Sequence, residues 1–301
     1  MLANLKLDAS HDGLIYLADA TRGLPYLRSH HHSELEVNFV CRGSITYLVD
    51  GHRYSFGVGA LIWIPSRQEH QLIARSADAQ FYVAAFKPSM VNSACRSSEY
   101  SDLRNLRGDH CGLLHSKVAF ETGRSMRDLM KTLIADAPDE AVLNREAGFG
   151  FDSEFQYRHR DCDALNAGLR YLLVHGWRAH KTRSDRSRKI ELHPAVTLAV
   201  ELLSKREASA TSLPQIASRC GLSPTYLSRL FHQQLGISLS QYRNSNRLSA
   251  FIEHYADGGR RTILDCALAA GFGSYAQFYK VFLSAYGEGP ARLIRRSGPH
   301  P

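Results

Sequence analysis

The sequence predicts an α+β protein of two domains: a mostly β N-terminal domain with a packet of helices, and an all-α C-terminal domain. Short runs rich in Val, Ile, Tyr and Phe occupy residues 10–90, and apolar residues at helical spacing occupy 115–175. The next segment, 176–193, is charged and poor in apolar side chains. We therefore expect one domain over 1–175, a linker over 176–193 and a second domain over 194–301. A chain of 301 residues can form two domains with separate cores.

The β prediction rests on strand-like runs separated by turn signals. In ITYLVDGHRYSF, residues 45–56, two such runs flank the pair Asp50-Gly51. Asp-Gly between alternating apolar residues is a strong signal for a β-hairpin. We expect a hairpin at this position.

The helical packet includes DALNAGLRYLLVHGW, residues 163–177, whose leucines fall on one stripe of a helix. The stripe has no other evident use in the sequence, so we expect it to form the interface of a homodimer. Its members are Leu165, Leu169, Leu172 and Leu173.

Charge is distributed unevenly along the chain. The formal net charge of +8 divides into −2 for residues 1–175, +4 for 176–193 and +6 for 194–301. A basic surplus confined to one end indicates an anionic partner, most often nucleic acid.

The sequence carries no signal for a membrane or for export. No apolar run is long enough to cross a bilayer, and the N-terminus lacks the basic and apolar regions of a secretory signal. The six cysteines show no CxxC spacing, which argues against a zinc finger or a disulfide framework. We expect a cytoplasmic protein without a membrane partner.

After the linker, the whole chain is predicted to be helical. Ser212 and Ser223 suit helix starts, and Gly221 and Gly236 suit helix ends. A long amphipathic helix is expected over 238–257.

This domain contains an internal repeat. IASRCGLSPTYLSRLFHQQLG, residues 216–236, matches CALAAGFGSYAQFYKVFLSAYG, residues 266–287, so that Gly221 corresponds to Gly271. A helix rich in small residues, a glycine turn and a second helix that packs back on the first are typical of a helix-turn-helix. The helix between the copies would span roughly 30 Å, and major grooves on one face of DNA recur about every 34 Å. Two recognition helices can therefore reach adjacent grooves.

Residues 194–296 resemble the DNA-binding domain of AraC-family transcriptional regulators. The most specific part is CALAAGFGSYAQFYKVFLSAYGEGP, residues 266–290, which is close to the pattern of that family. The resemblance implies a transcription regulator that binds double-stranded promoter DNA and works with RNA polymerase. Carried over by position, it implies DNA contacts from Pro224, Thr225, Ser228 and Arg229 in the first unit and from Ser274, Tyr275, Gln277, Tyr279 and Lys280 in the second.

Arg229 and Lys280 are expected to act differently. Arginine can form two hydrogen bonds with a guanine edge. Lys280 stands where the family often has arginine, and a lysine there favours a phosphate contact. Tyr226 and Tyr275 suit either the core or the surface. The positions assigned to the core are Leu222, Leu227, Leu230, Phe231, Phe272, Phe278 and Phe282.

Two segments of the first domain resemble the conserved segments of the cupin barrel. HHHSELEVNFVCRG contains His30, His32 and Glu36, and GALIWIPSRQEH ends in His70. In cupins, the first segment supplies two histidines and a glutamate, and the second supplies a further histidine. The resemblance implies a cupin-like β-barrel in which these four side chains converge.

The four side chains allow two interpretations. They can ligate a divalent transition metal, or they can bind a small polar effector without one. We favour the effector and no cofactor, and expect Tyr47 and Trp63 as further walls of the pocket, although either aromatic ring would also suit the core. By analogy with the family, a sugar is the leading candidate.

The function predicted is therefore a ligand-responsive, DNA-binding transcription regulator that is not an enzyme. The alternative is a metal-dependent cupin enzyme, such as a dioxygenase or an isomerase, with a helical appendage. The repeated helix-turn-helix and the basic C-terminal part favour the regulator.

Overall fold

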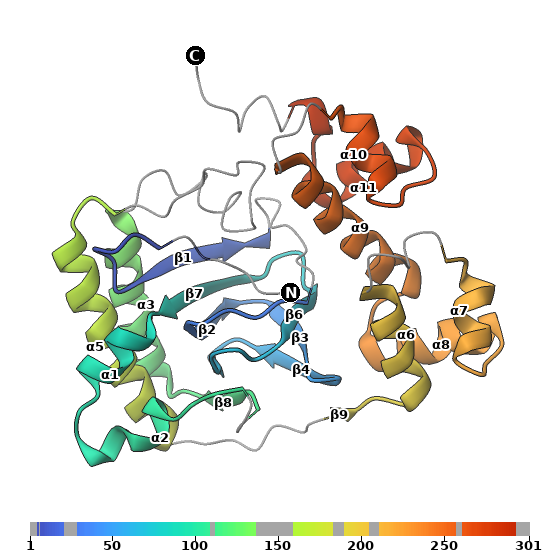
Figure 1. The fold of residues 1–301 in the computed structure, drawn as a ribbon. Coiled ribbons are helices and arrows are strands. Elements are labelled where there is room, and N and C mark those ends of the chain that lie inside the picture. The colour runs from blue at the N-terminus through green and yellow to red at the C-terminus, as the bar shows by residue number, and fades with distance from the viewer. Residues whose placement is uncertain are drawn as a thin grey trace.

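The protein has a β-sheet domain followed by a helical domain, as the α+β prediction requires (Figure 1). The structure is a computed structural model. It describes residue 5 and residues 7–20, 29–108, 112–136, 159–182, 190–204, 211–256 and 261–292.

The N-terminal domain contains two antiparallel sheets. The strands of the five-stranded sheet lie in the order β1 (Gly13–Asp19), β7 (Gln80–Phe86), β2 (Leu35–Arg42), β5 (Ala60–Ile64) and β8 (Leu114–Lys117). Those of the four-stranded sheet lie in the order β6 (His70–Arg75), β3 (Ser44–Val49), β4 (His52–Gly57) and β9 (Ile190–Glu191).

The predicted hairpin is formed by β3 and β4. Asp50 and Gly51 join the strands with φ of 46° and 71°, the two positive values that a type I′ turn needs. The Asp-Gly pair therefore fixes the register, in which Val49 lies opposite His52.

The two sheets face each other across an apolar core. Ile62 and Ile64 of β5 contribute to it from one sheet, and Tyr47 of β3 and Leu72 of β6 contribute from the other. Successive side chains of a strand point to opposite faces, so the residues between them point outward. Each sheet therefore has a second face that something else must cover.

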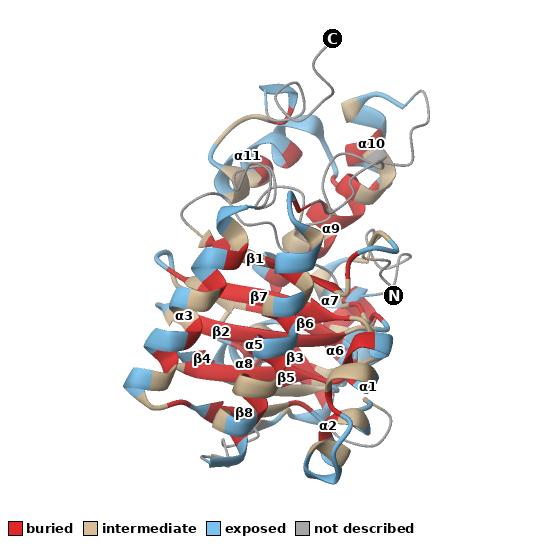
Figure 2. Ribbon diagram, turned by 90° about the vertical axis from the view of Figure 1, so that its left-hand side faces the viewer, coloured by how far each residue is buried: buried red, intermediate tan, exposed pale blue. Residues whose placement is uncertain are grey.

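Helices cover the outer face of the five-stranded sheet. They are α1 (Pro88–Ala94), the 3-10 turn η2 (Ser98–Tyr100), α2 (Ser101–Arg104), α3 (Phe120–Ala135) and α5 (Cys162–Thr182). Figure 2 shows the buried strands behind α3 and α5, whose outer surfaces are exposed. Both faces of this sheet are therefore buried.

The leucine stripe of α5 belongs to this core. Its four leucines are at most 1% exposed, packed within the domain itself. The predicted helix is confirmed, but the stripe already has a partner within the chain. It therefore gives no argument for a homodimer.

Regular structure extends into the range expected to be a linker. Helix α5 continues to Thr182, because Trp177 and His180 prolong its buried side. Further on, β9 pairs with β4 through Ile190–Arg53 and Glu191–His52.

The C-terminal domain consists of α6 (Pro194–Ser204), α7 (Leu213–Arg219), α8 (Pro224–Leu235), α9 (Leu239–Ala256), α10 (Ile263–Ala269) and α11 (Tyr275–Tyr286). Helices α6 to α8 and the start of α9 form one core. The rest of α9 forms another with α10 and α11. No helix in the described ranges is both long and apolar enough to span a membrane.

The internal repeat extends to the helix ends. Ser212 and Thr262 each form a capping box at the start of α7 and α10. Gly221 and Gly271 occupy the two turns with φ of 70° and 89°, where a Cβ would be strained. Both units therefore have the same helix-turn-helix geometry.

Candidate functional sites in the barrel and on two recognition helices

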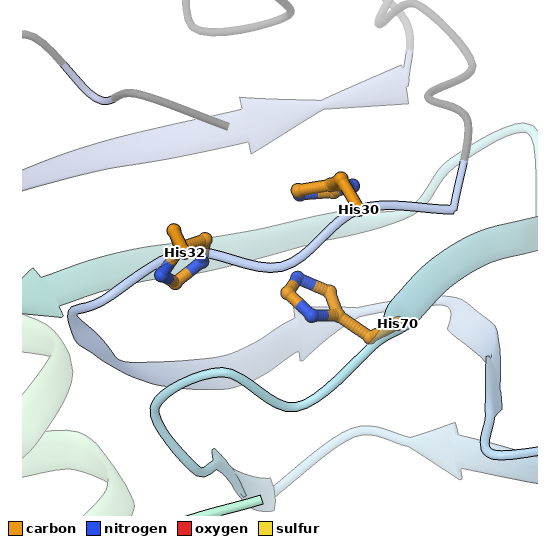
Figure 3. A group of neighbouring side chains, drawn as sticks. All are labelled: His30, His32 and His70. Carbon is orange, nitrogen blue, oxygen red and sulfur yellow. The ribbon is translucent and has the colours of Figure 1, made fainter. Parts of the chain in front are cut away.

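Three histidines gather between the sheets (Figure 3). His30 and His32 lie on the segment before β2, and His70 begins β6. His30 and His70 exchange backbone hydrogen bonds of 3.0 and 2.9 Å. The ring centroid of His70 lies 4.4 Å from that of His30 and 5.4 Å from that of His32. All three are at most 7% exposed.

Glu36 completes the cluster from β2. Its Oε2 lies 3.0 Å from His32 Nε2 and 3.6 Å from His70 Nε2. Its Oε1 accepts a hydrogen bond of 2.7 Å from Asn38 Nδ2. The structure thus brings together the four side chains that the cupin-like spacing singled out.

The cluster contains a buried ion pair. Burial opposes the charge of Glu36, but hydrogen bonds from His32 and His70 and their charges hold its pKa well below the ordinary value. Burial also opposes the charge of His32, but the hydrogen bond and charge of Glu36 raise its pKa above the ordinary value. Both shifts favour the charged forms, so the pair favours a carboxylate and an imidazolium side by side between the sheets.

Further polar side chains lie near the cluster. Asn38 is fully buried, and no described atom donates a hydrogen bond to its Oδ1. The ring of Tyr47 lies 6.2 Å from that of His70, and burial followed by the charge of Glu36 raises its pKa. Asn38 was not among the residues predicted from the sequence. Its position two residues after Glu36 on a strand was the available signal.

Trp63 does not face this cluster, contrary to expectation. It lies on the outer face of the five-stranded sheet, where its ring meets that of Trp177 at 5.2 Å in an edge-on arrangement. Strand alternation explains its position, because its neighbours Ile62 and Ile64 both point inward. Trp63 is therefore a core residue beneath α5.

The expected DNA-contacting residues lie on the surface of α8 and α11 or directly before α11. Ser228 is half-buried and the others are exposed. The exposed ones are Pro224, Thr225, Arg229, Ser274, Tyr275, Gln277, Tyr279 and Lys280.

Some of these side chains also have local roles. Ser274 Oγ caps α11 by accepting a hydrogen bond from the Gln277 backbone N–H, at 3.2 Å. Gln277 Oε1 accepts one from the Gly273 N–H at 3.0 Å, so its amide NH₂ is the group available to DNA. The guanidinium of Arg229 lies 5.2 Å from the ring centre of Tyr226. This cation–π contact orients Arg229 at the surface.

The core assignments in both units are confirmed. Tyr226 and Tyr275, left open by the sequence, are 42% and 40% exposed and so belong to the surface. Leu222 and Leu230 are partly buried against the first core. Fully or almost fully buried are Leu227, Phe231, Phe272, Phe278 and Phe282.

Comparison with known families assigns both domains. Residues 14–146 match the model of the AraC-like ligand binding domain, and residues 216–296 match a helix-turn-helix domain model. The chain belongs to the AraC family of transcriptional regulators. This AraC-family protein is accordingly a DNA-binding transcription regulator with a ligand-binding domain.

Similar proteins span both domains of the AraC-family chain. The melibiose operon regulatory protein of Escherichia coli K12 is 21% identical over 279 residues, which cover 89% of this chain and 84% of that protein. Fatty-acid-bound ToxT from Vibrio cholerae strain SCE256 aligns with a TM-score of 0.37 and 15% identity, covering 94% of each chain. The AraC-like activator CuxR aligns with a TM-score of 0.33 and 14% identity, covering 88% of this chain and 83% of that chain.

Proposed function

We propose that this regulator binds a small polar effector between its two sheets and reads promoter DNA with α8 and α11. The observation that carries the effector site is the buried cluster of Glu36, His30, His32 and His70. Buried ionisable groups are costly to keep in a protein core. A ligand that forms hydrogen bonds with these groups would offset part of that cost, which supports the cluster as the binding site.

A sugar suits the chemistry of the cluster. Hydroxyl groups can donate to the Glu36 carboxylate and to the Asn38 Oδ1, and can accept from a histidine N–H. The similar protein from E. coli is named for the operon of melibiose, a disaccharide. Both points support a sugar as the effector.

A thermal-shift screen over sugars and small organic acids tests this proposal. A ligand selective for the folded state raises the melting temperature with the logarithm of its concentration. We expect a sugar to do so for the wild-type chain and not for Glu36→Gln. Ser55→Ala, which alters the exposed Ser55 of β4, is the matched control and should respond like the wild type. An organic acid that stabilises both chains alike would contradict the proposal.

A divalent metal is the second candidate for this cluster. One nitrogen from each of the three histidines lies within 4.8 Å of the others, and Glu36 adds an oxygen. Three nitrogens and a carboxylate fit a transition metal, which would act as a Lewis acid when bound. However, both ring nitrogens of His32 face oxygen atoms, Glu34 O at 3.1 Å and Glu36 Oε2 at 3.0 Å. Such a ring is held with both nitrogens protonated, so we propose a metal-free sensor without enzymatic activity.

Metal analysis of the purified chain decides between the two. We expect less than stoichiometric zinc, nickel, manganese or iron. A full equivalent of one of them, lost on substitution of His30 by Ala, would establish the metal site and overturn the metal-free sensor.

The DNA-binding half of the proposal is tested by selection from a random-sequence duplex library. The wild-type chain should enrich a sequence with two recognition segments about one helical turn apart, because the repeat provides two recognition helices. Failure to enrich any sequence would contradict promoter recognition.

RNA polymerase as a partner, a homodimer and action in the cytoplasm are proposed from the family alone. Sedimentation analysis with and without the selected duplex tests the dimer.

A further inference from the structure

The outer face of the four-stranded sheet is covered by the DNA-binding domain. Leu48 of β3 and Ile73 of β6 are 6% and 2% exposed, and both belong to the apolar core built by α6 to α9. On β4, Arg53 Nη1 donates a hydrogen bond of 3.2 Å to the carbonyl oxygen of Gln234, at the end of α8. The two domains therefore share an apolar core through this sheet, which lies next to the C-terminal helices in Figure 1.

One polar side chain at this contact is held at both ends of its amide. Gln71 of β6 accepts a hydrogen bond of 2.7 Å from the Tyr242 hydroxyl and donates one of 3.1 Å to Asn246 Oδ1. Gln71, Tyr242 and Asn246 are at most 5% exposed. Hydrogen bonds in such a dry contact are costly to break without replacement.

Gln71 directly follows His70 in the chain. His70 points inward to the polar cluster, with Nε2 toward Glu36, whereas Gln71 points outward to α9. His70 is itself fixed by a hydrogen bond of 2.8 Å between its Nδ1 and the carbonyl oxygen of Gln68. A displacement of the β6 backbone at His70 therefore also displaces the side-chain amide of Gln71, which is hydrogen-bonded to α9.

Helix α9 connects the two helix-turn-helix units. Leu239 and Tyr242 belong to the core of the first unit, and Phe251 and Ile252 to the core of the second. Gln71 forms hydrogen bonds with the helix at Tyr242, at the edge of the first core, and at Asn246, which follows it toward the second core. Most of the expected DNA-contacting side chains stay exposed while the domains are in contact. The contact therefore leaves most of these side chains accessible to DNA.

We propose that Gln71 couples the effector site to DNA by bracing α9 in the arrangement that binds DNA. A ligand bound at the cluster shifts His70. Because Gln71 is the next residue of β6, its amide shifts as well, and this displaces α9 and the recognition helices on either side of it. The part of this proposal in which effector binding alters DNA binding rests on the proposed function. The contact by which Gln71 holds α9 does not.

The first test removes the amide without removing its bulk. Gln71→Met should weaken binding of the full chain to the duplex selected by the wild type at least about threefold, a typical coupling for contacting residues. Tyr242→Phe, which deletes the hydroxyl that donates to Gln71, should have a similar effect. The double variant should be no weaker than the weaker single variant. Ser55→Ala on the same sheet should bind like the wild type.

The second test follows the signal from the pocket. His70→Asn should change affinity for that duplex at least about threefold in the wild-type background and not in the Gln71→Met background. Equal effects of His70→Asn in the two backgrounds would overturn the coupling. Unchanged or tighter DNA binding by both Gln71→Met and Tyr242→Phe would overturn the bracing of α9.

Hydrogen exchange provides a readout that needs neither DNA nor effector. Backbone amides of α9 around residues 242–249 should exchange faster in Gln71→Met and in His70→Asn than in the wild type, while the strands of the five-stranded sheet keep their protection. Unchanged exchange in α9 would overturn the inference even where no DNA sequence is enriched. Loss of enrichment alone would instead count against the proposed function.

Discussion

Arg229 and Lys280 occupy exposed positions on different recognition helices, and their chemistry gives each a different expected contact with DNA. The guanidinium of Arg229 is planar and is oriented by Tyr226, which suits a base edge. The ammonium group of Lys280 is a mobile point charge, which suits a phosphate. The two side chains can therefore be separated experimentally.

Arg229→Ala should weaken binding by about 1–3 kcal/mol and relax sequence preference in one half of the operator only, because a base contact acts at one position. Footprinting on operators mutated in either half measures both effects. A uniform loss over both halves would contradict base reading by Arg229.

Lys280→Ala should weaken binding to all sequences alike. Without one phosphate contact, binding releases about one counterion fewer from the DNA. The magnitude of the slope of log K against log salt concentration should therefore fall by about one. Affinities measured at several salt concentrations give this slope. An unchanged slope together with altered sequence preference would assign Lys280 to a base.

The ion pair of Glu36 and His32 gives a prediction about pH. Glu36→Gln should lower the pKa of His32, because burial remains while the negative charge is lost and the neutral amide oxygen accepts a weaker hydrogen bond than the carboxylate. NMR titration of the His32 ring measures this. Glu34→Gln should lower it less, because Glu34 contributes less than Glu36.

The stability of the folded chain should reflect the same pair. The raised pKa of His32 contributes stability that is lost as the pH rises through it, and the lowered pKa of Glu36 contributes stability that is lost as the pH falls through it. The contribution is therefore greatest between the ordinary values of 4.5 for Glu and 6.5 for His. Chemical denaturation of Glu36→Gln and the wild type, from well below to well above this range, should show the largest difference in stability within it.

Single residues differed in how well the sequence predicted them. The four members of the cluster follow from two short segments with distinctive spacing. Trp63 could not be placed, because all five residues of β5 are buried and the strand shows no polar face. When both faces of a sheet are covered, alternation no longer tells inside from outside.

Among the elements, the two helix-turn-helix units have separate cores. Phe282 of α11 is fully buried and packs with Phe251, Phe278 and Tyr286 in the core of the second unit. The first unit has its own counterpart in Phe231. Damage to one unit should therefore leave the other folded.

Phe282→Ala should cost about 3–5 kcal/mol, the usual price of truncating a buried phenylalanine. The second unit should unfold first, with α8 still protected in hydrogen exchange. Leu283→Ala, at a position 40% exposed on the same helix, should change stability by less than about 0.5 kcal/mol. Equal losses in the two variants would place Phe282 outside the core.

The elements were largely predictable, because caps and glycines mark the helix ends directly in the sequence. The surface against which the α5 leucines pack could not be predicted, because an amphipathic helix has the same pattern whether it faces its own sheet or a second chain. Only the fold shows that the five-stranded sheet needs Leu165 and Leu169 for its outer face.

At the scale of the whole molecule, four layers follow one another: the helices over the first sheet, the two sheets, and the DNA-binding domain (Figure 1). The four-stranded sheet has an apolar core on each side, so its unfolding would expose both. Calorimetry should therefore show the barrel and the first helix-turn-helix unit melting together. Two well-separated transitions for these parts would contradict a shared core.

The contact that Leu48, Ile73 and Gln71 make with the C-terminal domain also bears on recombination of domains between members of the family. A chimera that joins this barrel to the DNA-binding domain of another family member would inherit the sheet but not the matching α6 and α9. Its two halves could fold and yet fail to respond to ligand. Transplanting Tyr242, Asn246 and the apolar face of α6 with the barrel should restore the response, which would define the unit of recombination as a domain together with its complementary surface.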